Sequence, residues 1–563
     1  MKNINEIFDK KENLNKNKPL FWFKQDLDWV SISWSEASNE KKKLIQILKS
    51  LKIKKGDKVS IIAQNSPRWC IADLSIMSLG GITVPGYITS NEDELLYLLN
   101  HSESKIAFVS SDILSKIEKV FKKLLYLKHI ICVDGLKKKF KKFNVVNYED
   151  LLKKFDLEKI VLSNKFQKVD KNDLACIIYT SGTSARPKGV MLTHGSIIEN
   201  IKGAKQFVDE IEGANHKFVS ILPLSHAYEH TGGFLLPILI GGEIYFSNNR
   251  EQLLSDLQFA KPTLMVAVPR LYDVLYKRIL NNIKSKGIIT KSLFFKTLKI
   301  GKKKYKKEKL SLLNKILDSF LDQIIRKKIK QIFGGNLIAF ISGGAALNFN
   351  SGIFFTSLGI KILQGYGQTE CSPIISVNPI NKIKLSTVGI PIKNHDVKLS
   401  KSGEILVKGP SLMKGYWKDK KSTNKTIKNG WLHTGDLGKI DEDKYISIVG
   451  RKNEMIVNTG GENISPVPLE ELLTSYEDIE QVMIYGHGKP YLVALIHSSL
   501  NKKDIKNIIG EINSKLSIEK KIRNFYSIDK PFTIETLELT PTLKMKRKVI
   551  EKKYEKQIRA MYK

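Results

Sequence analysis

The first 170 residues alternate between two kinds of apolar pattern. Residues 41–51 repeat apolar side chains at helical spacing, and residues 58–63 form a short apolar run that predicts a buried strand. The same alternation predicts further helices over 73–78 and 92–100, and further strands over 82–85, 105–109 and 130–133. Because strands that alternate with helices form parallel sheets covered on both faces, the pattern predicts an α/β fold.

Residues 281–330 combine apolar side chains at helical spacing with a large basic excess. They hold 16 Lys and Arg residues against 3 acidic residues. The apolar positions are Leu310, Leu312, Leu313, Ile316, Leu317, Phe320, Leu321, Ile324 and Ile325. This pattern favours a pair of amphipathic helices packed on the body of the protein. The alternative is an electrostatic contact surface for an anionic membrane.

The length of 563 residues predicts more than one domain, since a domain usually holds about 100–200 residues. Near Gly450 the chain passes from a Gly- and Asp-rich β region into a final block of about 110 residues, a size that suits a small separate domain. We therefore expect an N-terminal domain over 1–451, which includes the basic segment 281–330, and a C-terminal domain over 452–563.

The net charge of +36, from 93 basic and 57 acidic residues, first suggests nucleic acid or an anionic membrane as a partner. Only 10 of the basic residues are Arg, and the other 83 are Lys. The planar Arg side chain grips bases and phosphates best, so this bias argues against a nucleic-acid reader. We expect no nucleic-acid partner and attribute most of the charge to composition. Attraction to anionic lipid stays open.

Cysteine usage and the N-terminus indicate a reducing compartment. The four cysteines are scattered, without a CxxC pair or the spacing of metal ligands. The first ten residues lack the apolar core of a signal peptide. The most apolar stretch, 232–242, is far shorter than the ~20 residues of a membrane span. We expect a cytoplasmic protein and leave open a peripheral attachment to the inner face of the membrane.

The strongest local motif runs from Tyr179 to Val190, where a strand-like segment leads into hydroxyls, glycines and a lysine. Small residues let backbone N–H groups approach a polyphosphate, hydroxyls donate to its oxygens, and a lysine screens its charge. The motif is not a Walker A loop, because Pro187 precedes the lysine and Gly189 follows it. The candidate phosphate-binding residues are Thr180, Ser181, Gly182, Thr183, Ser184 and Lys188.

This loop resembles the phosphate loop of the adenylate-forming superfamily, which includes acyl-CoA synthetases, luciferases and peptide-synthetase adenylation domains. The usual pattern has a second glycine where this chain has Ala185. Further motifs follow in the family's order over about residues 20–550. The resemblance implies a large N-terminal domain of parallel-type sheets covered by helices, with a small β-barrel-like part, and a small α+β C-terminal lid domain.

The segment Leu222–Glu229 resembles the next family motif, in which His226 lies beside the acyl pocket. Residues 226–230 also match the H-x-x-E-H pattern of zinc proteases, which needs a helix to place both histidines on one face. Pro223 on one side and Gly232-Gly233 on the other make a poor helical setting. We therefore favour the acyl-pocket interpretation over zinc.

Two further motifs resemble the family's nucleotide-binding turns. Residues 341–346, with Gly344, resemble the substrate and adenine turn, and 261–272 is expected to end a neighbouring strand at the same cleft. The run 365–370 resembles the motif in which Tyr366 stacks on adenine and Thr369 holds the α-phosphate, and Gly367 of the same run is a further candidate nucleotide-binding residue. In the same motif Glu370 holds Mg²⁺, and a carboxylate supplies the hard oxygen that this ion prefers.

The remaining motifs lie toward the C-terminus. By resemblance, Asp436 and Arg451 contact the ribose of ATP, and a carboxylate suits a cis-diol because it only accepts hydrogen bonds. Asn453 stands at the family's hinge position. Gly460 and Gly461 resemble the loop that lines the pantetheine channel. Lys544 matches the family's catalytic lysine, and Lys546 is the alternative register.

The resemblance implies an enzyme that activates a fatty acid, most similar to the long-chain fatty-acid–CoA ligases. A carboxylate attacks the α-phosphorus of ATP with Mg²⁺ as cofactor, which gives acyl-AMP and pyrophosphate; the thiol of CoA then displaces AMP. The implied catalytic residues are Lys544, Thr369, Glu370 and His226. Medium-chain or aryl acids, and acyl carrier protein in place of CoA, stay open. An inactive basic scaffold that binds membrane or RNA is the non-enzymatic alternative.

Overall fold

The computed structural model describes residues 2–136, 144–155, 168–180, 186–211, 215–249, 251–476, 478–540 and 544–563. The chain divides into two compact units. The first contains residues 1–347, 351–397 and 407–432, and the second contains 348–350, 398–406 and 433–563. Each unit is described by itself below, and the domain boundary expected at residue 451 stays a prediction.

An eight-stranded sheet of order β19-β9-β8-β4-β3-β5-β6-β7 forms part of the first unit. Its strands are β3 (Lys58–Ile62), β4 (Ile82–Pro85), β5 (Ser104–Val109), β6 (His129–Cys132), β7 (Val145–Asn147), β8 (Leu174–Thr180), β9 (Lys188–Thr193) and β19 (Gly415–Tyr416). The strands from β8 to β7 run parallel, and β9 and β19 continue the sheet antiparallel.

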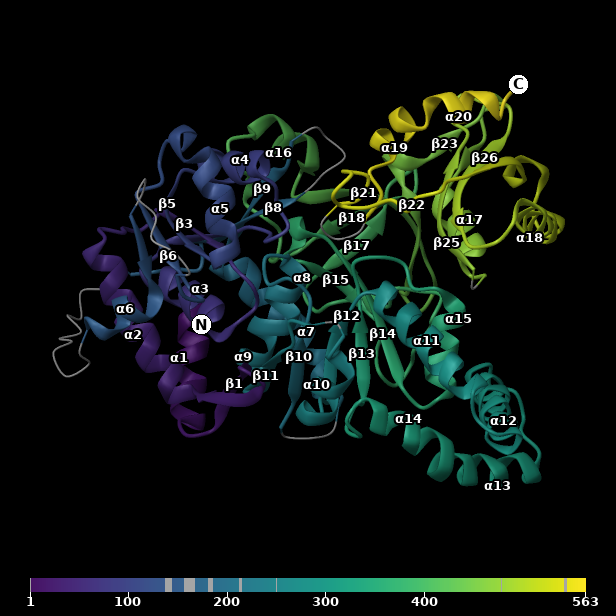
Figure 1. Ribbon diagram of the computed structural model, residues 1–563, viewed down its shortest axis with the longest axis horizontal. Helices are drawn as coiled ribbons and strands as arrows, with labels where there is room; N and C mark the ends of the chain where they lie inside the picture. The colour runs from purple at the N-terminus through teal and green to yellow at the C-terminus, as the bar shows by residue number, and fades with distance from the viewer. Residues whose placement is uncertain are drawn as a thin grey trace. The chain divides into compact units, whose positions relative to one another are not determined.

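Helices cover both faces of this sheet (Figure 1). They are α2 (Trp34–Ser50) and α3 (Pro67–Ser78) on one face, and α4 (Glu92–Ser102) and α5 (Ser111–Val120) on the other. Along β5 the side chains alternate: Ile106 and Phe108 pack with the first pair of helices, and Ala107 and Val109 pack with the second. The α/β fold predicted from the alternating apolar pattern is therefore confirmed.

A nine-stranded sheet of order β16-β15-β14-β13-β12-β10-β11-β1-β2 completes the framework of the first unit. Its strands are β1 (Pro19–Gln25), β2 (Asp28–Ser33), β10 (Lys217–Ser220), β11 (Glu243–Phe246), β12 (Leu264–Ala267), β13 (Ala339–Ser342), β14 (Lys361–Gly367), β15 (Ile374–Val377) and β16 (Ile390–Pro391). The pairs β10–β12, β12–β13 and β13–β14 are parallel. Because parallel strands end at one edge, the motifs that follow β12, β13 and β14 come together there.

Residues 227–240 form one helical run, made of α8 (Ala227–Glu229), the π-helical segment His230–Leu235 and α9 (Leu236–Ile240). The expectation of a poor helical setting was therefore wrong. Close packing requires a glycine at position 233, where an added Cβ would lie 2.3 Å from Oε1 of Glu229. The run is buried over Glu229–Leu239, so tertiary packing overrides the weak local propensity.

The basic segment forms the helices α12 (Ile288–Tyr305), α13 (Leu312–Leu321) and α14 (Lys327–Ile332), with a π-helical turn at Asp322–Arg326 (Figure 1). They follow α11 (Pro269–Lys284). Phe294, Leu321, Ile325 and Ile329 join a buried apolar cluster with residues of the nine-stranded sheet. The predicted packing of amphipathic helices on the body is confirmed for these side chains.

The second unit contains a three-stranded sheet of order β25-β26-β27, with strands Ile479–Tyr485, Leu492–Ser498 and Ile522–Ser527. Helices α17 (Pro466–Thr474) and α18 (Lys502–Ser514) pack on it around a core that includes Leu473, Ile496 and Ile505. Helices α19 (Arg547–Lys553) and α20 (Glu555–Ala560) close the chain. A small α+β unit at the C-terminus is the architecture expected from the resemblance.

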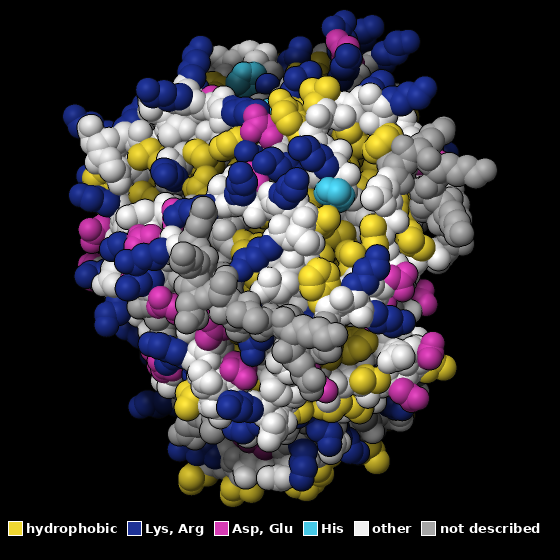
Figure 2. Space-filling model, turned by 90° about the vertical axis from the view of Figure 1, so that its left-hand side faces the viewer, with side chains coloured by type: hydrophobic (Ala, Val, Ile, Leu, Met, Phe, Trp, Pro, Cys, Tyr) yellow, Lys and Arg dark blue, Asp and Glu magenta, His cyan; other side chains and the backbone are white. Residues whose placement is uncertain are grey.

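Basic side chains are distributed over the surface of the molecule. Figure 2 shows Lys and Arg, in dark blue, spread across one face together with apolar and acidic side chains. All four cysteines are buried free thiols. Within the described residues, no helix is both long and apolar enough to span a membrane.

Candidate active site

The predicted phosphate loop joins two neighbouring antiparallel strands. Thr180 ends β8, Lys188 begins β9, and the two residues are paired in the register of the strands. Ser181, Gly182, Thr183 and Ser184 lie outside the described residues. The sheet therefore fixes both ends of the loop at its edge, as the strand-like segment before the motif predicts.

Lys188 is linked to Glu370 through Tyr416. Its Nζ donates a hydrogen bond of 2.8 Å to Oγ of Ser422 and lies 5.0 Å from the centre of the Tyr416 ring. The Tyr416 hydroxyl donates a hydrogen bond of 2.7 Å to Oε1 of Glu370. The lysine of one predicted motif and the carboxylate of another, far apart in sequence, thus contact the same tyrosine.

The backbone around Glu370 is held from several sides. Thr369 is buried, and both residues belong to the 3-10 turn Thr369–Cys371. The amide of Met413 donates to the carbonyl of Glu370, and Nδ2 of Asn200 donates to the carbonyl of Cys371. These bonds fix the direction of the Glu370 side chain, which is half-buried.

Tyr416 is a site residue that the sequence motifs did not reveal. It lies in β19, a two-residue strand that pairs with Val190 and Met191 of β9. Burial, and then the nearby Glu370 carboxylate, raise the pKa of its phenol, so the hydroxyl stays protonated and can donate. A Gly-Tyr pair after a loop has no local signature, since its position depends on a strand pairing between distant segments.

His226 and His230 have different partners, and only His230 lies within the helical run 227–240. His226 caps the start of α8, where its Nδ1 accepts a hydrogen bond from the amide of Tyr228. Nε2 of His230 lies 2.8 Å from a carboxylate oxygen of Asp73, and both side chains are buried. The zinc pattern needs both histidines on one helical face, but His226 precedes the helix in an extended conformation and the two histidines contact different groups.

Tyr228 connects the His226 motif to the turn after β13. Its hydroxyl donates a hydrogen bond of 2.8 Å to the carbonyl of Ile341. A Cβ added to Gly343 would lie 2.9 Å from the Tyr228 ring, so a glycine allows the close approach. Gly344 follows with φ of +84°, a conformation that favours glycine. Both predicted motifs therefore meet at the carboxyl ends of β12 and β13.

The motif that ends β14 also depends on close packing. Tyr366 is half-buried and pairs with Ser376 of β15. A Cβ on Gly367 would lie 2.0 Å from the carbonyl oxygen of Pro373, so only glycine fits there. Parallel pairing brings this motif to the same edge of the sheet as the turn with Gly344.

In the second unit, Asp436 and Arg451 are paired across two antiparallel strands, β21 (Trp431–Ile440) and β22 (Ile446–Arg451). Nε of Arg451 lies 2.9 Å from a carboxylate oxygen of Asp436. The Asp436 side chain is 6% exposed and that of Arg451 is 45% exposed. The two predicted ribose contacts are therefore neighbours.

The other predicted residues of the second unit lie on turns. Gly460 and Gly461 are exposed in the turn between β23 (Ile456–Val457) and β24 (Asn463–Ile464), where Gly461 has φ of +80°. Lys544 is exposed, and its amide donates to Oγ1 of Thr540. Arg547 anchors the adjacent helix through ion-paired hydrogen bonds of 2.6 and 2.7 Å to Glu470.

The donors present suit a magnesium ion that is shared with a nucleotide. Among the described residues no group of three or more His, Cys, Asp or Glu side chains is placed to hold a metal. Mg²⁺ commonly binds through one or two carboxylates together with substrate phosphates and water. A fixed, half-buried Glu370 carboxylate close to the phosphate-loop lysine fits that mode of binding.

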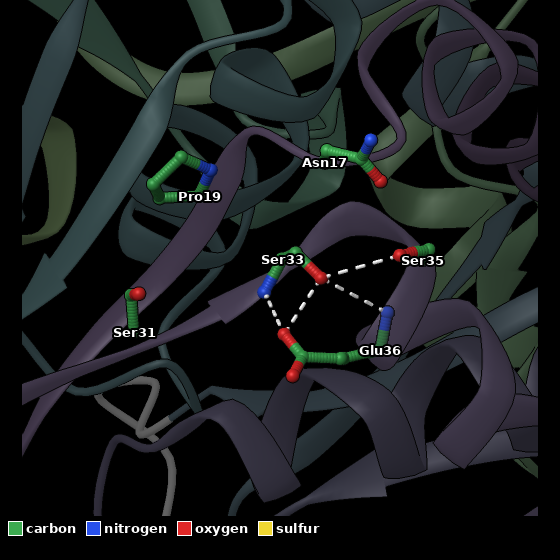
Figure 3. A pocket seen from close by; sticks show the side chains of 6 residues that line it. All are labelled: Asn17, Pro19, Ser31, Ser33, Ser35 and Glu36. Atoms are coloured by element: carbon green, nitrogen blue, oxygen red, sulfur yellow. Dashed lines mark hydrogen bonds between the residues drawn. The ribbon is translucent and has the colours of Figure 1, made fainter.

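A polar pocket of about 460 Å³ lies elsewhere in the first unit, at the start of α2 (Figure 3). It is lined by Asn17, Pro19, Ser31, Ser33, Ser35 and Glu36. Ser33 and Glu36 satisfy each other as a capping box, in which each side chain bonds to the other's backbone amide. These polar groups serve the helix terminus, and none of the predicted site residues lines the pocket.

Known proteins resemble the chain over nearly its whole length. The AMP-binding enzyme family matches residues 8–417, and the AMP-binding enzyme C-terminal domain matches 453–563. A long-chain-fatty-acid–CoA ligase, FadD15 of Mycobacterium bovis, is 30% identical, with 95% of this chain and 92% of that protein covered.

A further relative and a solved structure of the same fold name other substrates. The long-chain-fatty-acid–[acyl-carrier-protein] ligase AEE15 of Arabidopsis thaliana is 28% identical, over 95% of this chain and 82% of its own. The crystal structure of the anthranilate CoA ligase AuaEII with anthranoyl-AMP has the same fold, with a TM-score of 0.79 and 19% identity over 99% of this chain and 98% of that one.

Proposed function

The chain belongs to the AMP-binding enzyme family and is an adenylate-forming acid–thiol ligase, and we propose that its acid is a long-chain fatty acid and its thiol is CoA. The reaction uses ATP. A carboxylate oxygen attacks the α-phosphorus to form acyl-AMP and release pyrophosphate, and the sulfur of CoA then attacks the acyl carbonyl and releases AMP. The observation that carries the adenylation chemistry is the link from Lys188 through Tyr416 to Glu370, and the choice of acid and thiol rests on the family motifs and on the relative FadD15.

In the first half-reaction, charge on the phosphates must be neutralised at a fixed position. We assign Thr180, Lys188 and the intervening loop to the phosphates, and Thr369 to the α-phosphate. Glu370 would hold Mg²⁺, which supplies charge neutralisation when bound. The Tyr416 hydroxyl holds the Glu370 carboxylate in one orientation, so no reorganisation is needed when the nucleotide binds.

We assign the adenine and acyl groups to the edge where β12, β13 and β14 end. Tyr366 offers a ring for stacking on adenine, and Gly344 and Gly367 leave the backbone accessible. His226 borders the acyl pocket. The helix cap that it forms with Tyr228 orients its ring, and Tyr228 in turn bonds to β13. The contacts support one shared site for the nucleotide and the acid in this unit.

In the second unit, the Asp436 carboxylate is assigned to the ribose hydroxyls, with Arg451 beside it. Lys544 places a positive charge on the transferring group during adenylation, and the Gly460–Gly461 turn lines the pantetheine channel during thioester formation. We propose that residues 452–563 act as a mobile lid that is hinged near Asn453. This lid presents Lys544 during adenylation and the Gly460–Gly461 turn during thioester formation.

The long-chain assignment rests on the family motifs and on the relative FadD15, whose name states that substrate. The relative AEE15 is named for acyl carrier protein, and AuaEII is named for an aryl acid. A ligase that uses acyl carrier protein as its thiol, or an aryl acid as its acid, is therefore the second candidate function. Cytoplasmic location with peripheral attachment to a membrane completes the proposal, because long-chain acids partition into bilayers.

One assay separates these candidates. AMP and pyrophosphate are measured with acids of 6 to 20 carbons, and with anthranilate, in the presence of CoA, of acyl carrier protein, or of neither. The proposal predicts the highest kcat/KM for acids of about 16 carbons with CoA as acceptor, because a longer apolar chain buries more area. A preference for anthranilate or for acyl carrier protein would select the second candidate.

A further inference from the structure

Helix α13 carries a row of large apolar side chains on its exposed side. Leu312, Leu313, Ile316 and Phe320 are 77%, 80%, 70% and 53% exposed. Successive residues of a helix turn by about 100°, so these four fall within an arc of about 100°. We call them the α13 stripe. Single exposed apolar residues are common, but four on one face mark a contact surface.

The stripe belongs to a helix that is firmly held on its other side. Leu321 is buried in the core, and the buried Asp318 lies 2.7 Å from both Nζ of Lys304 on α12 and Nη2 of Arg326. The guanidinium of Arg326 is buried as well and donates to the carbonyl of Ser357. The exposed row is therefore a property of a docked helix and not of a frayed one.

Exposed basic residues lie next to the stripe along the chain. Lys306, Lys307 and Lys309 precede α13, Lys315 lies within it, and all four are exposed. The segment 281–330 as a whole has 16 basic and 3 acidic residues and is therefore strongly positive. A second copy of the chain on this surface would bring two such segments together, so like charges oppose self-association. An anionic lipid surface is complementary to it.

We propose that the α13 stripe inserts into the interfacial layer of an anionic lipid bilayer while the flanking lysines bind the lipid headgroups. Apolar side chains within a rim of lysines are the composition of helices that lie in a membrane interface. In this proposal, lipid binding by the α13 stripe requires neither nucleotide nor acid. Only the purpose of the binding, access to an acid dissolved in the bilayer, rests on the proposed function. Insertion of the stripe distinguishes this mode from purely electrostatic attachment.

The test is flotation of the full-length protein with vesicles of phosphatidylcholine and phosphatidylglycerol. A variant with Leu312→Gln, Leu313→Gln, Ile316→Gln and Phe320→Gln is expected to bind at least about tenfold less. The matched control, Leu14→Gln, Leu27→Gln, Leu125→Gln and Ile518→Gln, changes four scattered residues that are 73–80% exposed and is expected to bind like the wild type. Equal loss in both variants, or no loss in either, would overturn the proposal.

Salt and charge separate insertion from attraction alone. Replacing Lys306, Lys307, Lys309 and Lys315 by Gln is expected to weaken binding at low salt, while the wild type keeps part of its binding at 0.5 M salt, where the Debye length is about 4 Å. Complete release of the wild type at that salt concentration would contradict insertion. Absence of wild-type binding at low salt would overturn the whole proposal.

A fluorescent label reports insertion directly. All four native cysteines are buried, so an Ile316→Cys variant can be labelled selectively with an environment-sensitive dye. A blue shift with anionic vesicles, and quenching by lipid-attached quenchers, is expected; an unchanged spectrum contradicts insertion. A blue shift without vesicles that follows dimer formation in light scattering would identify a second copy as the occupant and overturn the proposal. AMP release from detergent-dissolved acid, measured separately, tests the proposed function independently of lipid binding.

Discussion

The hydroxyl of Tyr416 donates a 2.7 Å hydrogen bond to the carboxylate of Glu370, and the ring of the same tyrosine lies 5.0 Å from Nζ of Lys188. The tyrosine thereby couples the residue assigned to Mg²⁺ with the residue assigned to the phosphates. A neutral donor on a metal-binding carboxylate fixes its orientation without adding charge. The pairing can therefore be tested by changing one atom.

Tyr416→Phe removes that hydroxyl and keeps the ring beside Lys188. Loss of a hydrogen bond to a metal ligand typically costs 10–100-fold in metal affinity or activity, so the Mg²⁺ concentration for half-maximal AMP release is expected to rise about tenfold. Tyr245→Phe is the matched control, because its hydroxyl also donates to a glutamate, Glu243, at 2.8 Å. A Mg²⁺ requirement shifted equally in both variants would contradict the role of Tyr416.

The apolar pattern predicted the fold because it reports burial on both faces of a strand. Residues 106–109 show this, since alternate side chains pack with different helices and all four are apolar. The motifs likewise predicted that Lys188 and Glu370 belong to one site. They could not reveal Tyr416, whose place depends on the pairing of β19 with β9.

Two other features depended on packing that periodicity does not report. Gly232 and Gly233 suggested a break in the helix, yet the chain is helical there, and the Glu229 side chain occupies the space in which a Cβ of residue 233 would lie. In the basic segment, Leu321 and Leu313 both belong to the apolar positions at helical spacing, yet Leu321 is buried and Leu313 is exposed. A sequence pattern predicts which face of a helix a residue occupies, but it does not predict whether another part of the chain packs on that face.

Asp436 is expected to distinguish ATP from 2′-deoxy-ATP. A hydrogen bond to a charged group contributes about 1.5–3 kcal/mol, so the wild type should prefer ATP by about tenfold or more in kcat/KM. Asp436→Asn should reduce this preference to about twofold, since the amide is a weaker acceptor. The measurement is AMP or dAMP release with each nucleotide; an unchanged preference in the variant would remove Asp436 from the ribose site.

Lys544 is expected to act in adenylation alone. One well-placed donor to a developing charge is worth about 10²–10³-fold in rate, so Lys544→Ala should lower acyl-AMP formation by about that factor. Thioester formation from supplied acyl-AMP and CoA should stay within about threefold of the wild type, since the lysine serves only the first half-reaction. Lys546→Ala, two residues away, is the control for register. Equal loss of both half-reactions, or a larger loss at Lys546, would reject the assignment.

Glu229 makes stability depend on pH. Its side chain is fully buried, and the nearby Ser220 side chain offsets only part of the effect of burial. Burial raises the pKa of this carboxyl from 4.5 to about 8. Between these values the folded state holds a proton that the unfolded state has released, so this group lowers stability progressively as the pH rises from 4.5 to 8. Above pH 8 the loss is complete.

Glu229→Gln keeps the shape of the side chain and removes the titration. The melting temperature of the wild type is therefore expected to fall relative to that of the variant between about pH 4.5 and 8 and to stay at a constant difference above pH 8, with the two closest at the acid end. Glu243→Gln, at a half-buried carboxylate on β11, controls for the general effect of losing a negative charge. A difference between wild type and Glu229→Gln that is constant with pH, or that grows toward acid, would show that the Glu229 carboxyl is ionised in the folded protein.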